Sequence, residues 1–367
     1  WALNTQKGNL RINAAFGVVS PGFDVNDAGI QFRSDMLNGH VVVGYQWFEP
    51  DGIFRSKGFN VATFRSFDFG GRRTGDGYFL FGNGQFMNYW GFNFNMVFSP
   101  QYVDTRNTRG GPAMLTTNGY RFFIGGYTDQ RKDISFDLDM GGGRSESGGY
   151  QVNVSPGIEW RPTDGISLRF SPAFFRDVTI AQWVTNLDDP LATHTLGTRH
   201  IFGKLDQQEL SAILRLNWTF TPKLSLQVFV QPLISVGTYK EFKELKQPLT
   251  YSFNIYGQDG STITPQRDAQ GNITEYVVDP DGNGQAQALS FENPDFNFKS
   301  FRGNAILRWE YMAGSTLFFA WTHGRVDARN PGGLELARDF SDLFRTEPDN
   351  VFLVKIAYWL TPSNLGF

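Results

Sequence analysis

The sequence predicts an all-β chain folded as a transmembrane antiparallel outer-membrane β-barrel, with about 14 strands in this chain. Three observations lead to this fold class. Apolar and polar residues alternate through most of the chain, short and long connections alternate, and tryptophans recur beside the short connections. These features correspond to the strands of a barrel, to its loops and to its boundary with lipid.

Alternation identifies the strands. Between residues 209 and 231, apolar residues occupy nearly every second position, as in Leu214, Leu216 and Trp218, with Arg215 and Asn217 between them. Successive side chains of a strand point to opposite faces, so such a segment has one apolar and one polar face. The pattern and the turn residues predict strands near 9–18, 28–49, 52–69, 76–88, 91–104, 115–129, 132–142, 147–161, 165–186, 196–219, 222–243, 300–312, 314–327 and 349–360.

The connections after every second strand are tight, whereas the others are mostly longer and reach 244–299 and 328–348. Outer-membrane barrels have short periplasmic turns and long extracellular loops. We therefore expect the short turns and both chain ends on the periplasmic side of the outer membrane of a Gram-negative-type bacterium. The predicted tight turns are Pro50–Asp51, Tyr89–Trp90, Gln130–Arg131, 162–164, Pro222 and Ala313.

Six of the nine tryptophans stand where a strand meets a tight turn or, for the last of them, at the same level of the closing strand. An indole has an apolar body and one N–H donor, so it favours the boundary between hydrocarbon and water. A soluble β protein with tryptophans in its core is the alternative. The positions agree better with a membrane-interface girdle formed by Trp47, Trp90, Trp160, Trp218, Trp309 and Trp359.

Composition agrees with this class and excludes others. Mean hydropathy is −0.32 although aromatic residues make up 16% of the chain. A barrel conceals its hydrophobicity in alternate positions, whereas membrane helices need apolar runs of about 18 residues or more. The chain has no cysteine for a disulfide or thiolate site, and its net charge of −3 makes nucleic acid an unexpected partner. It opens at Trp1 without a signal peptide, which suggests a processed or partial chain.

Several segments carry a resemblance to a known family. They are SPGFDVNDAG (20–29), TRGGP (108–112), the stretch 202–237, FKELKQP (242–248) and the stretch 295–325. The chain resembles the C-terminal barrel of outer-membrane proteins of unknown function that often carry an N-terminal carbohydrate-binding family-9-like domain. The aromatic final strand, 351–360, also resembles the signal that barrel-assembly machinery reads. The resemblance implies a barrel, with upstream strands joining it if a larger one forms, and it supplies no catalytic residues.

No constellation of residues predicts an enzyme. The four histidines are scattered, no pair of carboxylates has an acid/base context, and the glycine-rich segments lack the strand-to-helix context of a phosphate loop. There is no GxSxG nucleophile elbow. We therefore expect no catalytic residues.

One loop resembles the first half of a calcium site. Asp279, Asp281 and Asn283 occupy positions 1, 3 and 5, Gly284 occupies position 6, and Gln285 follows. Ser290 stands at position 12 where an EF-hand needs a bidentate Glu, so a complete EF-hand is excluded. A Ca²⁺ ion is one interpretation. The other is an Asx/Gly turn in an extracellular hairpin with strands near Tyr251–Tyr256 and Ile273–Val278.

We expect one barrel domain over residues 1–367, with a hairpin inserted in the loop 244–299 and a short helix in the loop 328–348. Apolar and charged residues are interspersed in 332–350 in a pattern that suits an amphipathic helix. Such a helix would fold over the barrel mouth or into its lumen; a partly ordered surface loop is the alternative.

The polar strand positions predict the lining of the lumen, and their charges are of both signs. Mixed charge is compatible with water or with charges that pair across a plugged interior, and it argues against a steep ion filter. Two functions follow: a channel or transporter for a small solute or glycan fragment, or a structural barrel that anchors envelope proteins. Outer-membrane lipid and lipopolysaccharide are expected partners in both cases. The predicted lining residues are Gln151, Asn153, Glu159, Arg169, Arg215, Asn217, Gln227, Arg302, Asn304, Arg308, Glu310 and Lys355.

Overall fold

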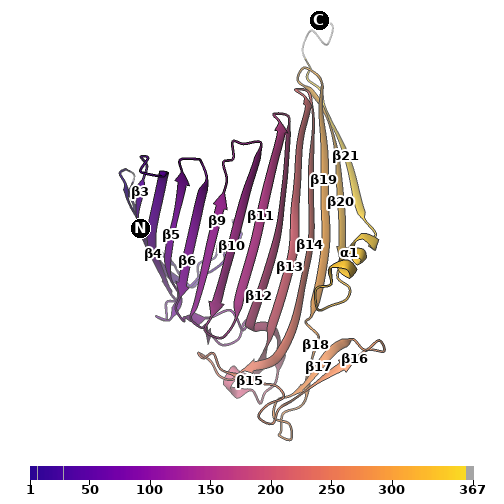
Figure 1. The fold of residues 1–367 in the computed structure, drawn as a ribbon. Coiled ribbons are helices and arrows are strands. Elements are labelled where there is room, and N and C mark those ends of the chain that lie inside the picture. The colour runs from indigo at the N-terminus through magenta and orange to yellow at the C-terminus, as the bar shows by residue number, and fades with distance from the viewer. Residues whose placement is uncertain (6, 28, 361–367) are drawn as a thin grey trace.

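The protein is dominated by one large, strongly curved antiparallel sheet (Figure 1). This computed structural model describes residues 1–5, 7–27 and 29–360, so the last seven residues of the predicted domain lie outside the described residues. Within the described residues, no helix is both long enough and apolar enough to cross a membrane. The strands and the single short helix make the architecture all-β, as the alternation predicts.

The sheet has 16 strands, and we call it the wall. Fifteen of them follow one another in chain order, each hydrogen-bonded to its neighbours, and β15 pairs with β14 beside this path. The wall strands are β1 (Ala2–Asn4), β2 (Leu10–Val19), β3 (Met36–Trp47), β4 (Phe54–Phe67), β5 (Arg73–Phe86), β6 (Gly91–Ser99), β9 (Gly119–Tyr127), β10 (Ile134–Ser145), β11 (Tyr150–Thr163), β12 (Ile166–Asp188), β13 (Thr198–Thr221), β14 (Leu224–Leu245), β15 (Phe253–Ile255), β19 (Phe296–Met312), β20 (Ser315–Asp327) and β21 (Asp349–Ala357).

Each of the fourteen predicted strands coincides with a wall strand, in the predicted order. The sequence did not predict β1, because three residues are too few for alternation to be recognised, whereas β15 falls within the predicted strand Tyr251–Tyr256 of the insertion. The remaining elements are short: β7 (Val103–Asp104), β8 (Met114–Leu115), β16 (Thr262–Arg267), β17 (Ile273–Asp279), β18 (Leu289–Glu292), the 3₁₀ turn η1 (Thr193–Thr195) and the helix α1 (Leu336–Arg345).

The two ends of the wall differ in their connections. The turns between β11 and β12, β13 and β14, and β19 and β20 are tight and lie at the upper end in Figure 1. The long segments 20–35, 100–118, 246–295 and 328–348 leave from the other end. We call these the tight-turn end and the long-loop end.

The prediction that both chain ends lie at the tight-turn end is wrong for the first residue. Ala2 pairs with Ala15 in the middle of β2, and the Trp1 ammonium donates to the Phe16 carbonyl at 2.9 Å. The first residues lie midway along the wall because they form a strand of their own beside β2, instead of leading into the first predicted strand.

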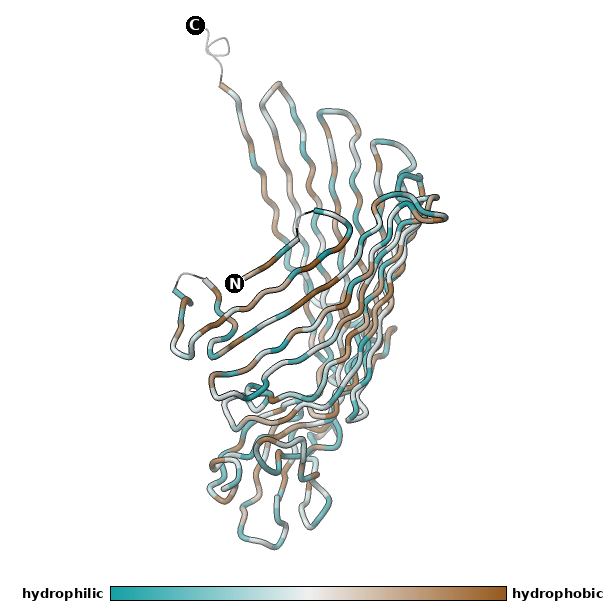
Figure 2. Tube along the Cα trace, turned by 90° about the vertical axis from the view of Figure 1, so that its left-hand side faces the viewer, coloured by the Kyte–Doolittle hydropathy of each residue, from teal (hydrophilic) through white to brown (hydrophobic). Residues whose placement is uncertain are grey.

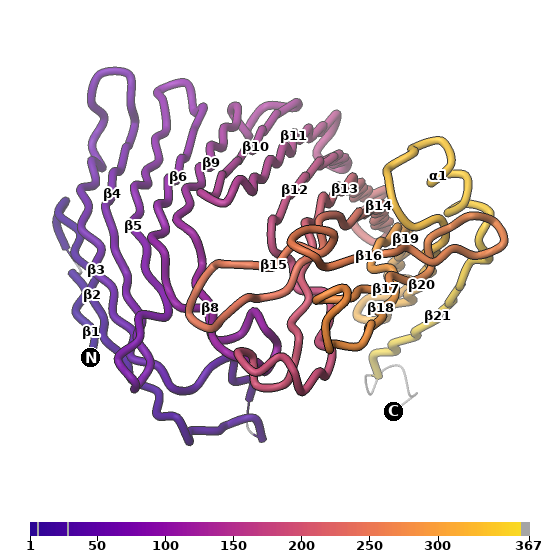
Figure 3. Tube along the Cα trace, turned by 90° about the horizontal axis from the view of Figure 1, so that it is seen from below, coloured from indigo at the N-terminus to yellow at the C-terminus, as the bar shows by residue number. Residues whose placement is uncertain are grey.

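The two faces of the wall differ in polarity, and hydrophobic and hydrophilic residues alternate along its strands (Figure 2). Register links Trp160 to Leu168, Leu168 to Leu216, and Leu224 to Trp309, so these side chains share one face. The opposite face, which includes Gln151 and Asp177, borders a pocket with Tyr102 and Tyr251 from the long loops. Figure 3 shows β8 and β15, the strands beside these loops, inside the curve of the wall. The polar face is therefore the concave face, and the tryptophan face is the convex face.

The wall has two free edges, because β1 and β21 do not pair with each other within the described residues. β2 runs from the tight-turn end to the long-loop end and is antiparallel to β1, so β1 runs toward the tight-turn end. β21 follows a long loop and is antiparallel to β20, so it runs in the same direction. The two edges are thus parallel to each other.

At the long-loop end, β12, β13 and β14 extend beyond their neighbours and are covered on both faces. Ile201 and Phe202 are consecutive and completely buried. They belong to different hydrophobic clusters, one with Phe242 and residues of β17 and β18, the other with Met114 beside β8 and Leu245. Because consecutive side chains point to opposite faces, this end is a layered structure with two cores.

The predicted pairing within the insertion 244–299 is wrong. β15, inside the predicted strand Tyr251–Tyr256, pairs with β14 and thereby joins the wall. β17 instead pairs with β16 and β18 in a separate three-stranded sheet. Burial explains why the two predicted strands approach each other without pairing. Tyr256 and Val278 lie in the same hydrophobic cluster, which does not require hydrogen bonds between their strands.

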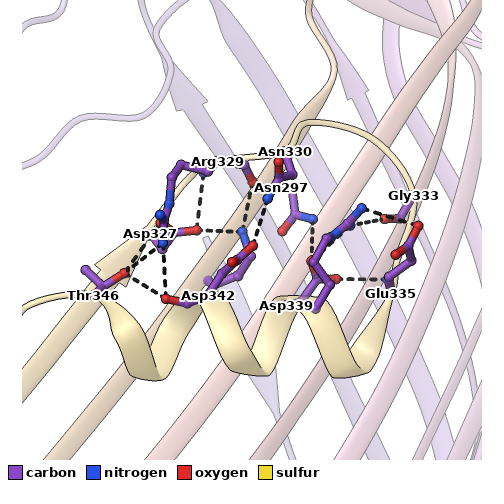
Figure 4. A network of polar contacts seen from close by, with 11 residues as sticks. Asn297, Asp327, Arg329, Asn330, Gly333, Glu335, Asp339, Asp342 and Thr346 are labelled. Atoms are coloured by element: carbon purple, nitrogen blue, oxygen red, sulfur yellow. Dashed lines mark hydrogen bonds and ion pairs between the residues drawn. The ribbon is translucent and has the colours of Figure 1, made fainter. Parts of the chain in front are cut away.

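The helix α1 forms where amphipathic character predicts one, but it lies neither over the mouth nor in the lumen. It packs on the convex face, because Asn297 and Lys299 alternate in phase with Trp309 along β19. Asn297 donates to Asp339 of α1 at 3.0 Å, and Lys299 donates to Asp327 at 2.7 Å and to the Arg329 carbonyl at 2.9 Å. Figure 4 shows the resulting network along one side of the helix. The completely buried Leu343 completes the contact, so the helix packs where Asn297 and Lys299 supply polar partners for it and its flanking loop.

Candidate functional site at the concave face

All twelve residues predicted to line a lumen lie on the concave face. Register places Glu159 opposite Arg169, Arg169 opposite Arg215, and Asn217 opposite Gln227. Arg302, Asn304, Arg308 and Glu310 alternate on β19, and Lys355 shares their face through Phe318. Gln151 and Asn153 take the same phase on β11. The register therefore places all twelve on one shared face, and their position in a lumen stays a prediction.

Some of these side chains contact one another or other concave-face residues. Arg169 lies 2.8 Å from Asp137, Ser167 donates to Glu159 at 3.1 Å, and Arg308 lies 3.5 Å from Glu310. Thr322 donates to Asn304 at 2.8 Å. The twelve residues carry five cations and two anions, and these contacts pair some of the charges.

The predicted girdle tryptophans lie near the tight-turn end. Trp47, Trp160, Trp218 and Trp309 are strand residues of the convex face. Trp90 follows the turn after β5 and is 51% exposed, and Trp359 follows β21 and is 62% exposed. All six therefore have much of their indole surface outside any core of the wall.

The segment 100–118 bridges the hollow at the long-loop end. It leaves β6, forms the small β7–β8 ladder and returns to β9. On its way, Leu115 donates to the Thr250 carbonyl at 3.1 Å, and the Leu249 N–H donates to Ala113 at 2.8 Å. Arg106 also donates to the Phe32 carbonyl. Three long loops thus meet across the mouth of the concave face.

One end of this bridge is fixed by a close approach of backbone to a buried ring. His200 of β13 is 2% exposed, and its Nδ1 lies 2.8 Å from Asn186 Oδ1. Asn186 in turn donates to the Thr108 carbonyl at 3.1 Å. A Cβ on Gly111 would lie 2.1 Å from His200 Cε1, so only glycine fits here.

A pocket of about 480 Å³ lies between this bridge and the wall. Its lining combines Arg121, Gln151 and Asp177 of the concave face with Tyr102 and Tyr251 of the loops. Burial raises the pKa of both tyrosines, so their hydroxyls stay neutral donors and acceptors at ordinary pH. Such a mixture of aromatic rings, an amide and both charges suits a polar, uncharged solute.

Sequence reasoning found Gln151 but missed the residues of the bridge. Tyr102, Arg106 and Met114 lie in a segment without alternation, and their partners are as far away in the chain as Phe32 and Thr250. The signal that could have pointed to them is TRGGP (108–112), whose consecutive glycines permit the close approach to His200.

The calcium interpretation remains a prediction. Asp279 accepts hydrogen bonds from the N–H groups of Asp281 and Gly282, and Asp281 accepts one from Ala286. These are the contacts of an Asx turn. No group of three or more histidines and carboxylates gathers into a metal-binding arrangement in the part of the chain that the structure describes. Asn283 and Gln285 lie in the same loop, outside strand β17.

Comparison with known protein families assigns the chain to one of them. No curated protein matches the chain. A family model described as a domain of unknown function (DUF5916) matches residues 1–365, which is nearly the whole sequence. The chain therefore belongs to the DUF5916 family.

Proposed function

We propose that the wall is part of a β-barrel in the outer membrane and that its concave face is the pathway of a small polar solute or glycan fragment. The segregation of polarity supports this proposal: the convex face carries the tryptophans and apolar side chains, and the concave face carries the twelve polar residues. An outer-membrane barrel needs this arrangement, with lipid outside and water or polar groups inside.

The observation that carries the proposal is the bridged mouth. A polar face leads to a pocket of about 480 Å³ beneath the segment 100–118, which is held by hydrogen bonds with Phe32, with Leu249 and Thr250, and with Asn186. A bridge of this kind suits gated passage: a solute that binds in the pocket competes with the contacts that hold the bridge across the mouth. The long loops would then be extracellular.

Conductance tests the proposal. The natural full-length polypeptide, folded into planar bilayers, should show rare or small single-channel steps. Gly111→Ala should raise the open probability, because the new Cβ cannot fit against His200 and the bridge must move. Gly22→Ala is the matched control, since nothing lies within 4 Å of its added Cβ. Silence of both variants in heat-modifiable, folded protein would contradict a pore.

A second candidate is a structural barrel that anchors envelope proteins and has a plugged lumen. The observation that favours it is the buried packing of the bridge, where Met114 is 1% exposed and contacts Phe202 in one hydrophobic cluster. In this case neither variant conducts, and envelope proteins copurify with the wild type through the layered long-loop end.

A further inference from the structure

A row of amphipathic side chains crosses the convex face near the long-loop end, opposite the tryptophans near the tight-turn end. Hydrogen-bonded neighbours on successive strands align Tyr78 with Phe98, Phe98 with Tyr120, Tyr120 with Arg144, and Arg144 with Tyr150. Tyr78, Tyr120 and Tyr150 are 42%, 56% and 37% exposed. We call this the tyrosine row; it consists of Tyr78, Phe98, Tyr120, Arg144 and Tyr150. Its side chains are amphipathic, like those of the tryptophans at the other end.

The distance between the tyrosine row and the tryptophans matches the thickness of a membrane. On β11, ten residues separate Tyr150 from Trp160, and Val152, Val154 and Ile158 lie between them on the same face. At roughly 3.3 Å per residue and a strand tilt of about 40°, ten residues span about 25 Å along the membrane normal. The convex face of β13 changes to polar residues at Gln208, again ten residues from Trp218.

Arg144 differs from the other arginines near this row. Arg65 lies 3.4 Å from Asp76 and donates to Tyr78, and Arg176 lies 2.7 Å from Asp206. Among the described residues, the side chain of Arg144 has no hydrogen-bond or ion-pair partner. Tyr120 and Tyr150 stand directly opposite Arg144 on the two neighbouring strands. Arg176 also lies 5.7 Å from the Tyr150 ring, which adds a second cation nearby.

We propose that Arg144, Tyr120 and Tyr150 bind the phosphate of a membrane lipid whose acyl chains lie along the apolar band between the tyrosine row and the tryptophans. The inference rests on the membrane placement in the proposed function. An arginine guanidinium and phenolic hydroxyls are suitable donors for phosphate oxygens. The apolar residues on one side of Arg144 fit acyl chains, so the phosphate comes from a lipid and not from solution.

Lipid retention tests this site. Protein reconstituted in nanodiscs that contain a phosphorylated lipid is released into detergent, and bound lipid is counted by native mass spectrometry. Arg144→Glu should reduce retention about fivefold, which corresponds to about 1 kcal/mol for one cation at a membrane surface. Arg144→Lys should retain most of it. Arg267→Glu, the same charge change on β16 in the separate three-stranded sheet, should behave as wild type.

Two results would overturn the site. Equal retention by wild type and Arg144→Glu shows that the lipid does not use Arg144. Displacement of the lipid by millimolar inorganic phosphate shows that the site holds an adventitious ion only. Failure of the wild type to integrate into vesicles overturns the membrane placement itself and therefore both proposals, whereas integration with unchanged retention removes only the lipid site.

Discussion

At the scale of single residues, Arg199 joins two carboxylates at the long-loop end. Its guanidinium lies 2.7 Å from Asp189 and 2.7 Å from Glu244, and Tyr256 donates to the same Glu244 at 2.9 Å. The side chains of Arg199, Asp189 and Glu244 are 11%, 8% and 8% exposed. One buried cation therefore compensates two buried anions between the two hydrophobic clusters.

Replacing that cation should loosen the layered end without affecting the wall. Arg199→Met leaves two carboxylates buried without a counter-charge, and breaking such a pair costs about 3–5 kcal/mol. Hydrogen exchange of residues 198–204 should rise accordingly, while that of residues 210–220 stays unchanged. Adding Glu244→Gln to Arg199→Met should restore part of the protection; a double variant as exchange-labile as the single one would contradict the electrostatic explanation.

The same network should weaken in acid. Burial raises the pKa of Asp189, but hydrogen bonds from the Leu191 N–H and from Arg199 outweigh it and hold the pKa below its ordinary value. A depressed carboxyl pKa stabilises the folded state above the unfolded pKa of about 3.9, and this stabilisation is lost as pH falls through the folded value. Protection of residues 188–199 should thus be constant from neutral pH to about 4 and decline below it, and Asp189→Asn should abolish the pH dependence. A decline that begins near neutral pH would contradict this assignment.

Alternation explains which residues could be located from the sequence. It placed Gln151, Arg215 and Arg302 on one face because a strand has only two faces. It could not reveal that His200 meets Gly111, because that contact depends on how a loop returns to the wall. Lys299 is an exception to the apolar pattern that the sequence could have indicated, because it alternates in phase with Trp309, where a lipid-facing residue should be apolar. Another segment of the chain was therefore expected to cover its side chain.

At the scale of elements, α1 shows how a loop covers such an exception. Its polar side meets Asn297, the Arg329 side chain donates to the Asp342 carbonyl of the helix at 3.2 Å, and its apolar side chain Leu343 is completely buried. Phe344 packs against Phe301 with the rings tilted and their centroids 5.5 Å apart. Leu336 and Phe344 remain 46% and 51% exposed. Together with the tyrosine row, the helix marks the limit of the apolar band of the convex face toward the long-loop end, on the side of β19 and β20.

Removing the buried leucine should release the helix. Leu343→Ala removes methyl groups from a site that is 0% exposed, which costs about 2–5 kcal/mol in comparable cores. Leu336→Ala is the matched control, because the same change at an exposed position costs at most about 0.5 kcal/mol. Limited proteolysis should cut the first variant between 330 and 348 and leave the control intact. Equal resistance of the two variants would show that polar contacts alone hold α1.

Helices and strands whose apolar residues repeat with a regular period could be predicted from the sequence. Arrangements that depend on partners far away in the sequence could not. All fourteen long strands carry their own alternation, and α1 carries its own amphipathic pattern. β15 lies in the predicted strand Tyr251–Tyr256, but its partner could not be predicted, because the pairing depends on how far β14 extends. Likewise, the face that α1 covers follows from Lys299 and Asp327, which no local pattern of the helix itself can indicate.

At the scale of the whole molecule, the wall has fifteen strands in its continuous path and two edges that run in the same direction. An antiparallel wall that closes directly needs an even number of strands, as single-chain bacterial barrels have. β21 presents Phe352, Leu353 and Val354 with 63%, 55% and 60% exposure, so both of its faces and its edge are accessible. Direct pairing of β1 with β21 would be the only parallel ladder in the wall.

Cysteine pairs test this geometry well because the chain has no cysteine of its own. Phe319→Cys with Val354→Cys, which face each other on β20 and β21, should crosslink with a short bifunctional maleimide. Leu3→Cys combined in turn with Leu353→Cys, Val354→Cys or Lys355→Cys should not. A crosslink in any of the latter pairs within one molecule would show that the wall closes on itself through a parallel pair.

The shared direction of the two edges also bears on how copies of the protein meet. Copies inserted with the same orientation can only present like-directed strands to one another, whichever of their edges come together. A β21 edge with exposed aromatic and aliphatic side chains would otherwise be a template for runaway polymerisation. In the proposed membrane placement, two copies of the protein would therefore have to join their edges as a parallel pair, whereas every ladder of the described wall is antiparallel, so strand direction would disfavour pairing between copies.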